Sequence, residues 1–202
     1  MKRNILMLGG LLLIAAALCL TAHNLIESKQ AGDAAQKTLL EVSALISELE
    51  KESSEDIPDS EKEMPSVEVN GSEYIGILEM PALDLSLPVM SDWSYEKLKQ
   101  APCLYKGSPY LQNMIIAGHN YSRHFGKLKT LSSGDEIFFT DADGHRFCYA
   151  VSEVETLNGF ASEEMETGNW ALTLFTCTIG GQNRVTVRCS QADAIETDSE
   201  KN

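Results

Sequence analysis

Eighteen consecutive uncharged residues near the N-terminus place the strongest constraint on how this chain can fold. The run ILMLGGLLLIAAALCLTA covers residues 5–22 and is preceded by the cations Lys2 and Arg3. It exceeds the apolar core of a signal peptide and lies within the length range of a membrane-spanning helix. Cations on its N-terminal side predict a cytoplasmic N-terminus with the rest of the chain outside. We expect an uncleaved anchor, with a cleaved signal peptide as the alternative.

A helical stalk and a linker are expected after the anchor. AAQKTLLEVSALISELEKE places Leu39, Val42, Ile46 and Leu49 at spacings of three and four, which gives one apolar stripe on a helix. The stripe fits a stalk helix that packs weakly on the following domain. A short self-associating coil is the alternative, although such coils normally need three to four heptads. The acidic, proline-containing sequence SSEDIPDSEKEMPS then predicts a flexible linker.

The charge and the cysteines exclude several classes of protein. The net charge is −14, but residues 27–73 hold 13 acidic and 4 basic side chains, so much of the acidity precedes the folded domain. The sequence has no basic stripe, which argues against nucleic acid as a partner. The five cysteines show no C-x-x-C spacing, so neither a zinc ribbon nor a full disulfide framework is indicated. An odd cysteine in an exported domain suggests a free, reactive thiol.

Short strand-like runs dominate the chain from Tyr74 onward. YIGILEMPALDLSLPVM, NMIIAG, WALTLFT and RVTVRC are apolar or alternating, and they are separated by turn residues. DEIFFTDADGHRFCYAVSEVETL predicts a hairpin with Asp143 and Gly144 at its turn. Seven or eight such strands at even spacing, without a long helical pattern between them, predict an all-β barrel or sandwich.

Two of these strands present residues suited to nucleophilic chemistry. Cys177 ends the run LTLFTC, and Arg184 opens the next run after a short glycine-containing turn, so the two side chains should be neighbours. A guanidinium beside a thiol favours the thiolate and can donate to an oxyanion. His119 follows the buried run NMIIAG and emerges into a loop, where proton-transfer groups are often placed; His124 lies in the same loop and is expected to be more mobile. On the residues alone, an inert Cys177 and a structural or surface His119 stay open.

The combination of these motifs resembles the sortases. LTLFTC is similar to their T-L-x-T-C signature, RVTV supplies the downstream arginine, and AGHN is similar to their histidine motif. The order histidine, cysteine, arginine also fits, as do the N-terminal anchor and polar linker. The resemblance covers roughly residues 72–190.

This resemblance implies an all-β, sortase-type eight-stranded β-barrel with short helices, preceded by a transmembrane helix and a stalk helix. It implies a membrane-anchored extracellular cysteine transpeptidase that needs no metal or other cofactor. Cys177 would be the nucleophile that forms a thioester with an L-P-x-T-G-like sorting signal, and His119 would transfer protons. Arg184 would bind substrate and stabilise the oxyanion, with Thr176 helping to shape the oxyanion hole. The implied partners are sorting-signal-bearing surface proteins, a cell-wall amine such as a peptidoglycan precursor, and the membrane.

Several alternatives bear on these assignments. Arg188 would share a strand face with Arg184, although Arg184 stands where the family arginine does. GHN…FGKL and TCT resemble class B sortases, but the segment NGFASEEMETGN is too short for the long helix usual in that class. The size and the first strands look more like class A or D. No lid-like insertion or second membrane segment is seen, which argues against a pilus-polymerising class C enzyme. The acidic residues Glu163, Glu164 and Glu166 lie where some relatives bind calcium, but a solvated loop is expected there.

Other activities fit the sequence less well. An L,D-transpeptidase would place its cysteine in S-x-G-C, and a papain-like peptidase would place cysteine before histidine. A non-enzyme alternative is an anchored β-domain that binds wall components. The expected organisation is a cytoplasmic tip and anchor (1–28), a stalk and acidic linker (29–71), the catalytic domain (72–190) and an acidic tail (191–202).

Overall fold

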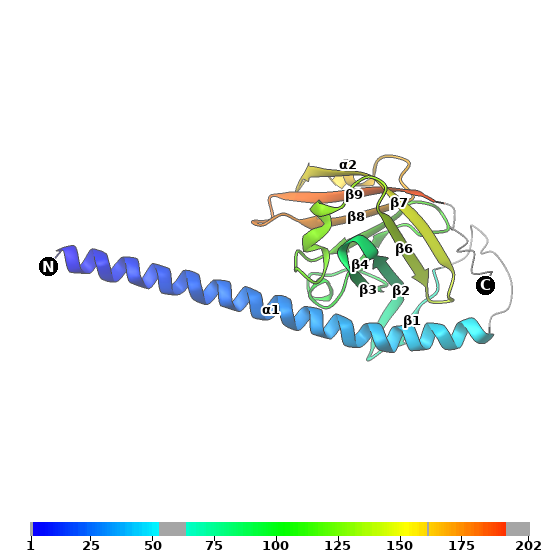
Figure 1. Ribbon diagram of the computed structural model, residues 1–202, viewed down its shortest axis with the longest axis horizontal. Coiled ribbons are helices and arrows are strands. Elements are labelled where there is room, and N and C mark those ends of the chain that lie inside the picture. Colours follow the sequence, from blue (N-terminus) through cyan, green and yellow to red (C-terminus); the bar gives the residue numbers. More distant parts are fainter. Residues whose placement is uncertain (1, 53–63, 161, 193–202) are drawn as a thin grey trace, which may run out of the picture.

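A single long helix precedes the β-domain. The computed structural model describes residues 2–52, 64–160 and 162–192. Its first element is α1 (Lys2–Glu52), which includes both the expected anchor and the expected stalk in one continuous helix. The N-terminal half projects away from the domain, while the C-terminal half runs along it (Figure 1). The projecting part is apolar and long enough to cross a membrane, which fits a transmembrane anchor. The predicted acidic linker lies mostly outside the described residues, as does most of the predicted tail.

The β-domain is a closed barrel of eight strands, as predicted. The ring closes because its last strand pairs with β2, its first. In spatial order the ring contains β2 (Ser72–Met80), β3 (Leu85–Met90), β4 (Cys103–Lys106), β5 (Met114–Gly118), β8 (Leu172–Cys177), β9 (Asn183–Gln191), β7 (Arg146–Asn158) and β6 (Glu136–Asp141). A ninth described strand, β1 (Val67–Val69), pairs only with the start of β2.

Alternating side chains build the barrel and fill its core. In β6, for example, Ile137, Phe139 and Asp141 are buried while the residues between them are more exposed. The predicted hairpin is confirmed by the antiparallel pairing of β6 with β7. Closure depends on Gly76, because a Cβ there would lie only 2.1 Å from the carbonyl oxygen of Thr140 on β6. Four short helices lie in the described connections between strands: η1 (Pro81–Leu83), η2 (Lys97–Lys99), η3 (Phe125–Thr130) and α2 (Ser162–Glu166).

The second half of α1 packs against one side of the barrel. Val42 and Ile46 are buried among Val69, Tyr74 and Cys103, so the centre of the predicted stripe is confirmed. The ends of the stripe differ from expectation, because Leu49 is exposed while the contact extends back to Ala31 and Ala35.

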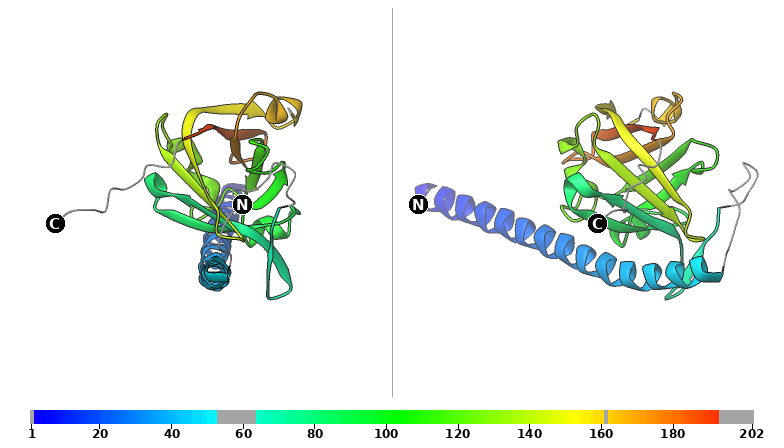
Figure 2. Two further views of the ribbon diagram at one scale, coloured as in Figure 1. Left: turned by 90° about the vertical axis from the view of Figure 1, so that its right-hand side faces the viewer. Right: turned by 45° about the vertical axis from the view of Figure 1, so that its right-hand side comes forward.

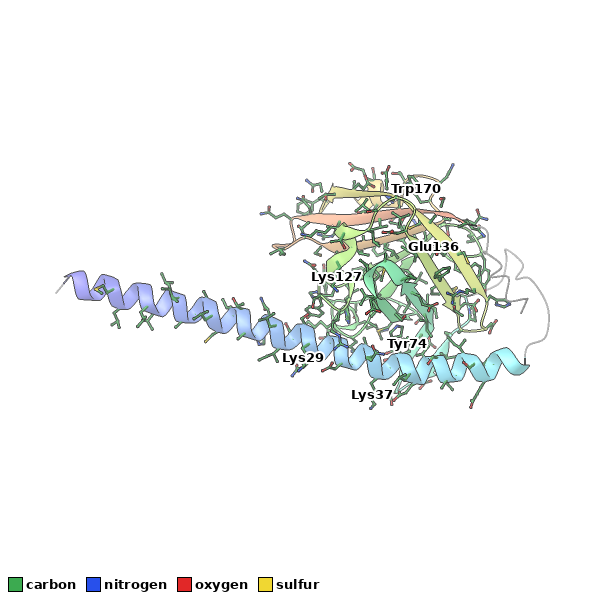
Figure 3. All side chains as sticks on the ribbon, viewed as in Figure 1. Lys29, Lys37, Tyr74, Lys127, Glu136 and Trp170 are labelled. Atoms are coloured by element: carbon green, nitrogen blue, oxygen red, sulfur yellow. The ribbon has the colours of Figure 1, made fainter. Side chains whose placement is uncertain are left out.

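Figures 2 and 3 place this helix relative to the barrel. Viewed nearly along its axis, α1 lies beside the barrel (Figure 2, left). Lys29 marks the region where the helix reaches the domain, below η3, which carries Lys127 (Figure 3). Polar contacts accompany the apolar packing there, including an ion pair between Arg123 and Asp33 and a hydrogen bond of 3.3 Å between Ser28 and Ser122.

Candidate active site

Strand pairing brings the three predicted site residues to one end of the barrel. The parallel strands β5 and β8 are in register, with Gly118 opposite Thr176, so His119 and Cys177 follow at neighbouring strand ends. On the other side of β8, the antiparallel strand β9 places Arg184 directly opposite Cys177. Directly paired residues share a sheet face, so the thiol and the guanidinium lie on the same side.

Cys177 stands where two surface hollows meet. The aromatic hollow is lined by Trp93, Tyr105, Met165, Phe175, Cys177 and Arg184. The helix-side hollow lies on the other side of the thiol, where α1 and the β8–β9 turn face the loop after β5. Its lining includes Glu27, Ser28, His119, Tyr121, Cys177 and Ile179. The half-buried thiol is therefore open to a ligand from two directions and does not point into the barrel core.

The His119 ring is held by an aromatic neighbour. It stacks on Tyr121 with ring centroids 4.0 Å apart and an interplanar angle of 4°. Burial lowers the pKa of His119; the negative charge of Glu27 opposes this effect, and Lys99 adds to it. The imidazole is therefore neutral near pH 7 and able to accept a proton.

Arg184 is held by backbone groups rather than by a carboxylate. Its Nη1 donates to the carbonyl oxygen of Gly181 in the β8–β9 turn at 2.9 Å and to that of Asn183, the first residue of β9, at 3.1 Å. Within the described ranges of the chain, no acidic side chain forms an ion pair with it. The half-buried guanidinium thus keeps its charge available to a ligand in the aromatic hollow.

Arg188 has a different environment, although it lies on the same strand face. Its side chain is only 4% exposed, and Nε donates to Glu155 at 2.8 Å. Nη1 donates to the carbonyl oxygen of Met165 at 2.7 Å and to the Thr173 hydroxyl at 3.2 Å, while Nη2 donates to the carbonyl oxygen of Glu164 at 2.7 Å. Arg188 therefore fastens α2 to the sheet and fixes Met165 as a wall of the aromatic hollow.

Thr176 has its hydroxyl group in the barrel interior. Successive residues of a strand point to opposite faces, so its side chain points away from that of Cys177. The hydroxyl is buried and has no hydrogen-bond partner among the described residues. A role of the Thr176 hydroxyl in an oxyanion hole does not fit this orientation, which leaves its backbone as the group that could contribute.

Two of the other cysteines are poorly suited to nucleophilic chemistry. Cys103 and Cys189 are fully buried, and burial raises the pKa of each thiol to about 12. Cys148 is half-buried on β7, and Cys19 lies in the apolar part of α1. Of the described cysteines, Cys177 is the one that lines the two hollows.

Comparison with known proteins identifies the domain. The family model of the sortase domain matches residues 78–192, which is more than half of the chain. This chain belongs to the sortase family. The family assignment decides against the L,D-transpeptidase and papain-like alternatives and makes the protein a cysteine transpeptidase. No curated protein sequence matches it closely enough to count as a relative.

Solved structures support the same fold for this sortase. A sortase D5 transpeptidase of Clostridium perfringens is 20% identical with a TM-score of 0.59, over 80% of this chain and 99% of that one. Sortase C1 of Streptococcus agalactiae is 22% identical with a TM-score of 0.54, over 62% of this chain and 71% of that one. Sortase A of Listeria monocytogenes is 21% identical with a TM-score of 0.52, over 59% of this chain and 88% of that one. Sortases named as classes A, C and D thus have similar sequence identities and TM-scores to this chain.

The acidic segment Glu163–Glu166, where some relatives bind calcium, interacts with other protein groups in this sortase. Glu166 pairs with Lys106, and the carbonyl oxygen of Glu164 accepts a hydrogen bond from Arg188. In the parts of the chain that the structure describes, no three His, Cys, Asp or Glu side chains form a group suited to a metal ion.

Sequence reasoning missed the contribution of α1 and misjudged His124. The helix supplies Leu25, Glu27 and Ser28 to the helix-side hollow, which no local sequence pattern indicated. His124 was expected to be mobile, but it is fully buried between Tyr121 and the backbone of Ala31 on α1.

The burial of His124 predicts a loss of stability in acid. Burial lowers the pKa of His124 from 6.5 to about 4; contact with the backbone of Ala31 opposes this shift, and the charges of His119 and Arg123 add to it. Below pH 6.5 the His124 imidazole therefore binds a proton in the unfolded chain but stays neutral in the folded chain. The free energy of unfolding decreases as the pH falls toward 4. We expect His124 to contribute a loss of about 2 kcal/mol in the free energy of unfolding between pH 7 and pH 5. Urea unfolding of the full chain and of His124→Phe, followed by tryptophan fluorescence, measures this; equal pH dependence in both would contradict it.

Proposed function

We propose that this sortase is a single-pass membrane enzyme that cleaves an LPxTG-like sorting signal and joins the surface protein to a cell-wall amine. The observation that carries this proposal is the position of Cys177 at the junction of two hollows. One hollow contains Arg184 and the other contains His119. A transpeptidase needs this arrangement, because its nucleophile must meet an acyl donor and then an acceptor.

The aromatic hollow suits the apolar part of the sorting signal. Tyr105 packs edge-on against Phe175 with centroids 5.4 Å apart, and Trp93 lies 5.8 Å from Tyr105. These rings provide an apolar surface for a leucine and a proline that precede the scissile bond. Arg184, at the same end of the hollow as Cys177, is placed to donate to the carbonyl oxygen of the reacting threonine.

The reaction then follows in two balanced steps. The neutral imidazole of His119 accepts the Cys177 proton, the thiolate attacks the threonine carbonyl carbon, and a thioester forms as the amide C–N bond breaks. The imidazolium gives its proton to the departing amine. In the second step an incoming amine attacks the thioester, His119 takes a proton from its nitrogen, and Cys177 leaves as the thiolate. Arg184 stabilises the negative oxygen in both steps.

The same proposal places the enzyme at the cell surface. The apolar first part of α1 would span the membrane, with Lys2 and Arg3 on the cytoplasmic side and the barrel outside. The barrel lies beyond the end of the apolar run, on the second half of the helix (Figure 1). Surface proteins that carry a sorting signal, and an amine of the peptidoglycan or its precursor, would be its partners.

Trapping the thioester tests nucleophile and sorting motif together. Full-length protein in detergent would be incubated without acceptor with pentapeptides of the form Leu-Pro-Xaa-Thr-Gly and with scrambled peptides, then quenched in acid. Intact mass analysis should show an adduct equal to the peptide without its C-terminal glycine, located on Cys177 by peptide mapping. An adduct on another cysteine, or equal adducts with scrambled peptides, would contradict the proposal.

A further inference from the structure

The anchor helix itself forms part of the site. We infer that the helix-side hollow is the binding site for the acceptor amine, which enters as an ammonium ion, and that Glu27 of α1 is the residue that binds it. This inference rests on the proposed function and extends it from the donor peptide to the acceptor. Leu25, Glu27 and Ser28 line the hollow from α1, and none of them lies within residues 78–192 that match the family domain.

The two substrates must approach Cys177 from different sides. Once the thioester forms, the acyl chain occupies the aromatic hollow beside Arg184. The attacking nitrogen must reach the acyl carbon and also pass a proton to His119. His119 faces the helix-side hollow and is absent from the lining of the aromatic one. The acceptor therefore has to come through the space between α1, His119 and the β8–β9 turn.

The charge in this hollow suits an ammonium ion. An α-amino group has an ordinary pKa of about 8, so an acceptor of this kind is mostly cationic at pH 7. Among the described residues that line the hollow, Glu27 is the one with a carboxylate. It forms no ion pair within the described ranges, and its charge acts on both His119 and Tyr121. Lys99, the cation in the same lining, acts on His119 more weakly than Glu27 does.

The order of proton transfers assigns Glu27 to binding of the acceptor and not to the chemical step. The bound ammonium ion first loses one proton to solvent, which frees the lone pair of its nitrogen. The resulting amine attacks the acyl carbon, His119 takes the second proton from the nitrogen, and the carbon–sulfur bond breaks with Cys177 leaving as the thiolate. Glu27 binds the cation before these transfers, so its contribution falls on the ground-state complex and appears in KM rather than kcat.

The substitution Glu27→Gln tests this role in the full-length enzyme in detergent micelles. Initial transpeptidation rates at pH 7 would be measured with a saturating sorting peptide and two acceptors, glycinamide, which is largely cationic, and hydroxylamine, which is neutral. We expect the apparent KM for glycinamide to rise about two- to fivefold, the effect of losing a partly exposed charge pair. The KM for hydroxylamine should stay at its wild-type value, because a neutral acceptor gains no charge attraction from the Glu27 carboxylate.

Two further variants separate charge recognition from a structural effect. Glu27→Asp keeps the charge and should recover part of the glycinamide affinity. Glu48→Gln removes an exposed carboxylate from the same helix, outside the lining of the hollow, and should leave both acceptors unaffected.

Defined outcomes would overturn the inference. An unchanged glycinamide KM in Glu27→Gln would exclude Glu27 as the ammonium-binding residue, and equal losses with both acceptors would indicate a purely structural role. Each of these results leaves the proposed function intact, because thioester formation reports on it separately. A wild-type enzyme that forms no thioester with any peptide would overturn the proposed function and this inference with it.

Discussion

Replacing Cys177 with alanine is expected to abolish cleavage of the sorting signal, with turnover falling by about a thousandfold or more. The thiol is the group at the junction of the two hollows, and alanine leaves no atom there that can form the thioester. Its side chain is half-buried at the end of β8, outside the barrel core, so the fold should survive its removal. Product formation by liquid chromatography, together with thermal unfolding of the full-length variant, measures both effects.

Cys148→Ala provides the matched control for that loss. Cys148 is also half-buried and lies on a strand, but it lines neither hollow. Its replacement should leave turnover unchanged. Wild-type cleavage by the Cys177→Ala variant would remove Cys177 from the reaction, and an equal loss in Cys148→Ala would point to a general effect of thiol removal on the domain.

The second large effect is expected at Arg184. Its replacement by alanine should lower kcat about 100- to 1,000-fold, because the donor to the developing oxyanion is lost. The guanidinium bonds two turn carbonyls and no described carboxylate, so the midpoint of thermal unfolding should change little. Steady-state kinetics on a fluorescent sorting peptide, paired with circular dichroism, tests the prediction.

Arg188→Ala distinguishes the two arginines of β9. Arg188 is buried and hydrogen-bonded to Glu155 and to the backbone of α2, so its removal leaves several buried acceptors unpaired. We expect a loss of about 3 kcal/mol in the free energy of unfolding, with lost turnover as its consequence. If Arg184→Ala kept wild-type turnover, the substrate role would pass to Arg188.

The barrel could be predicted from sequence because its signals are local. Alternating residues and turn pairs, such as Asp143 and Gly144, define the strands before any long-range contact forms. The continuity of α1 was less apparent, because the hydrophobic pattern changes from an all-round apolar run to a single stripe. Residues 23–36 nevertheless contain no proline, and their one glycine, Gly32, packs against Arg123. The absence of a helix breaker was the available signal.

The residues alone predicted the site only where its members lie close together in the sequence. Cys177 and Arg184 are joined by a short turn, so their proximity followed from the hairpin. The approach of His119 to Cys177 depends on the parallel pairing of β5 with β8, whose partners are separated by most of the second half of the domain. A parallel pair has no turn signature, so the family resemblance was needed. Glu27 comes from the docking of α1, which has no local signature at all.

The unbroken course of α1 also sets the orientation of the enzyme relative to its surroundings. A helix rises about 1.5 Å and turns about 100° with each residue, and α1 has no break between Glu27 and the apolar part that we propose spans the membrane. The catalytic cleft would therefore keep a fixed distance from the membrane surface and a fixed orientation relative to it. Donor and acceptor would have to travel along the bilayer to reach it, instead of the enzyme swinging outward to collect them.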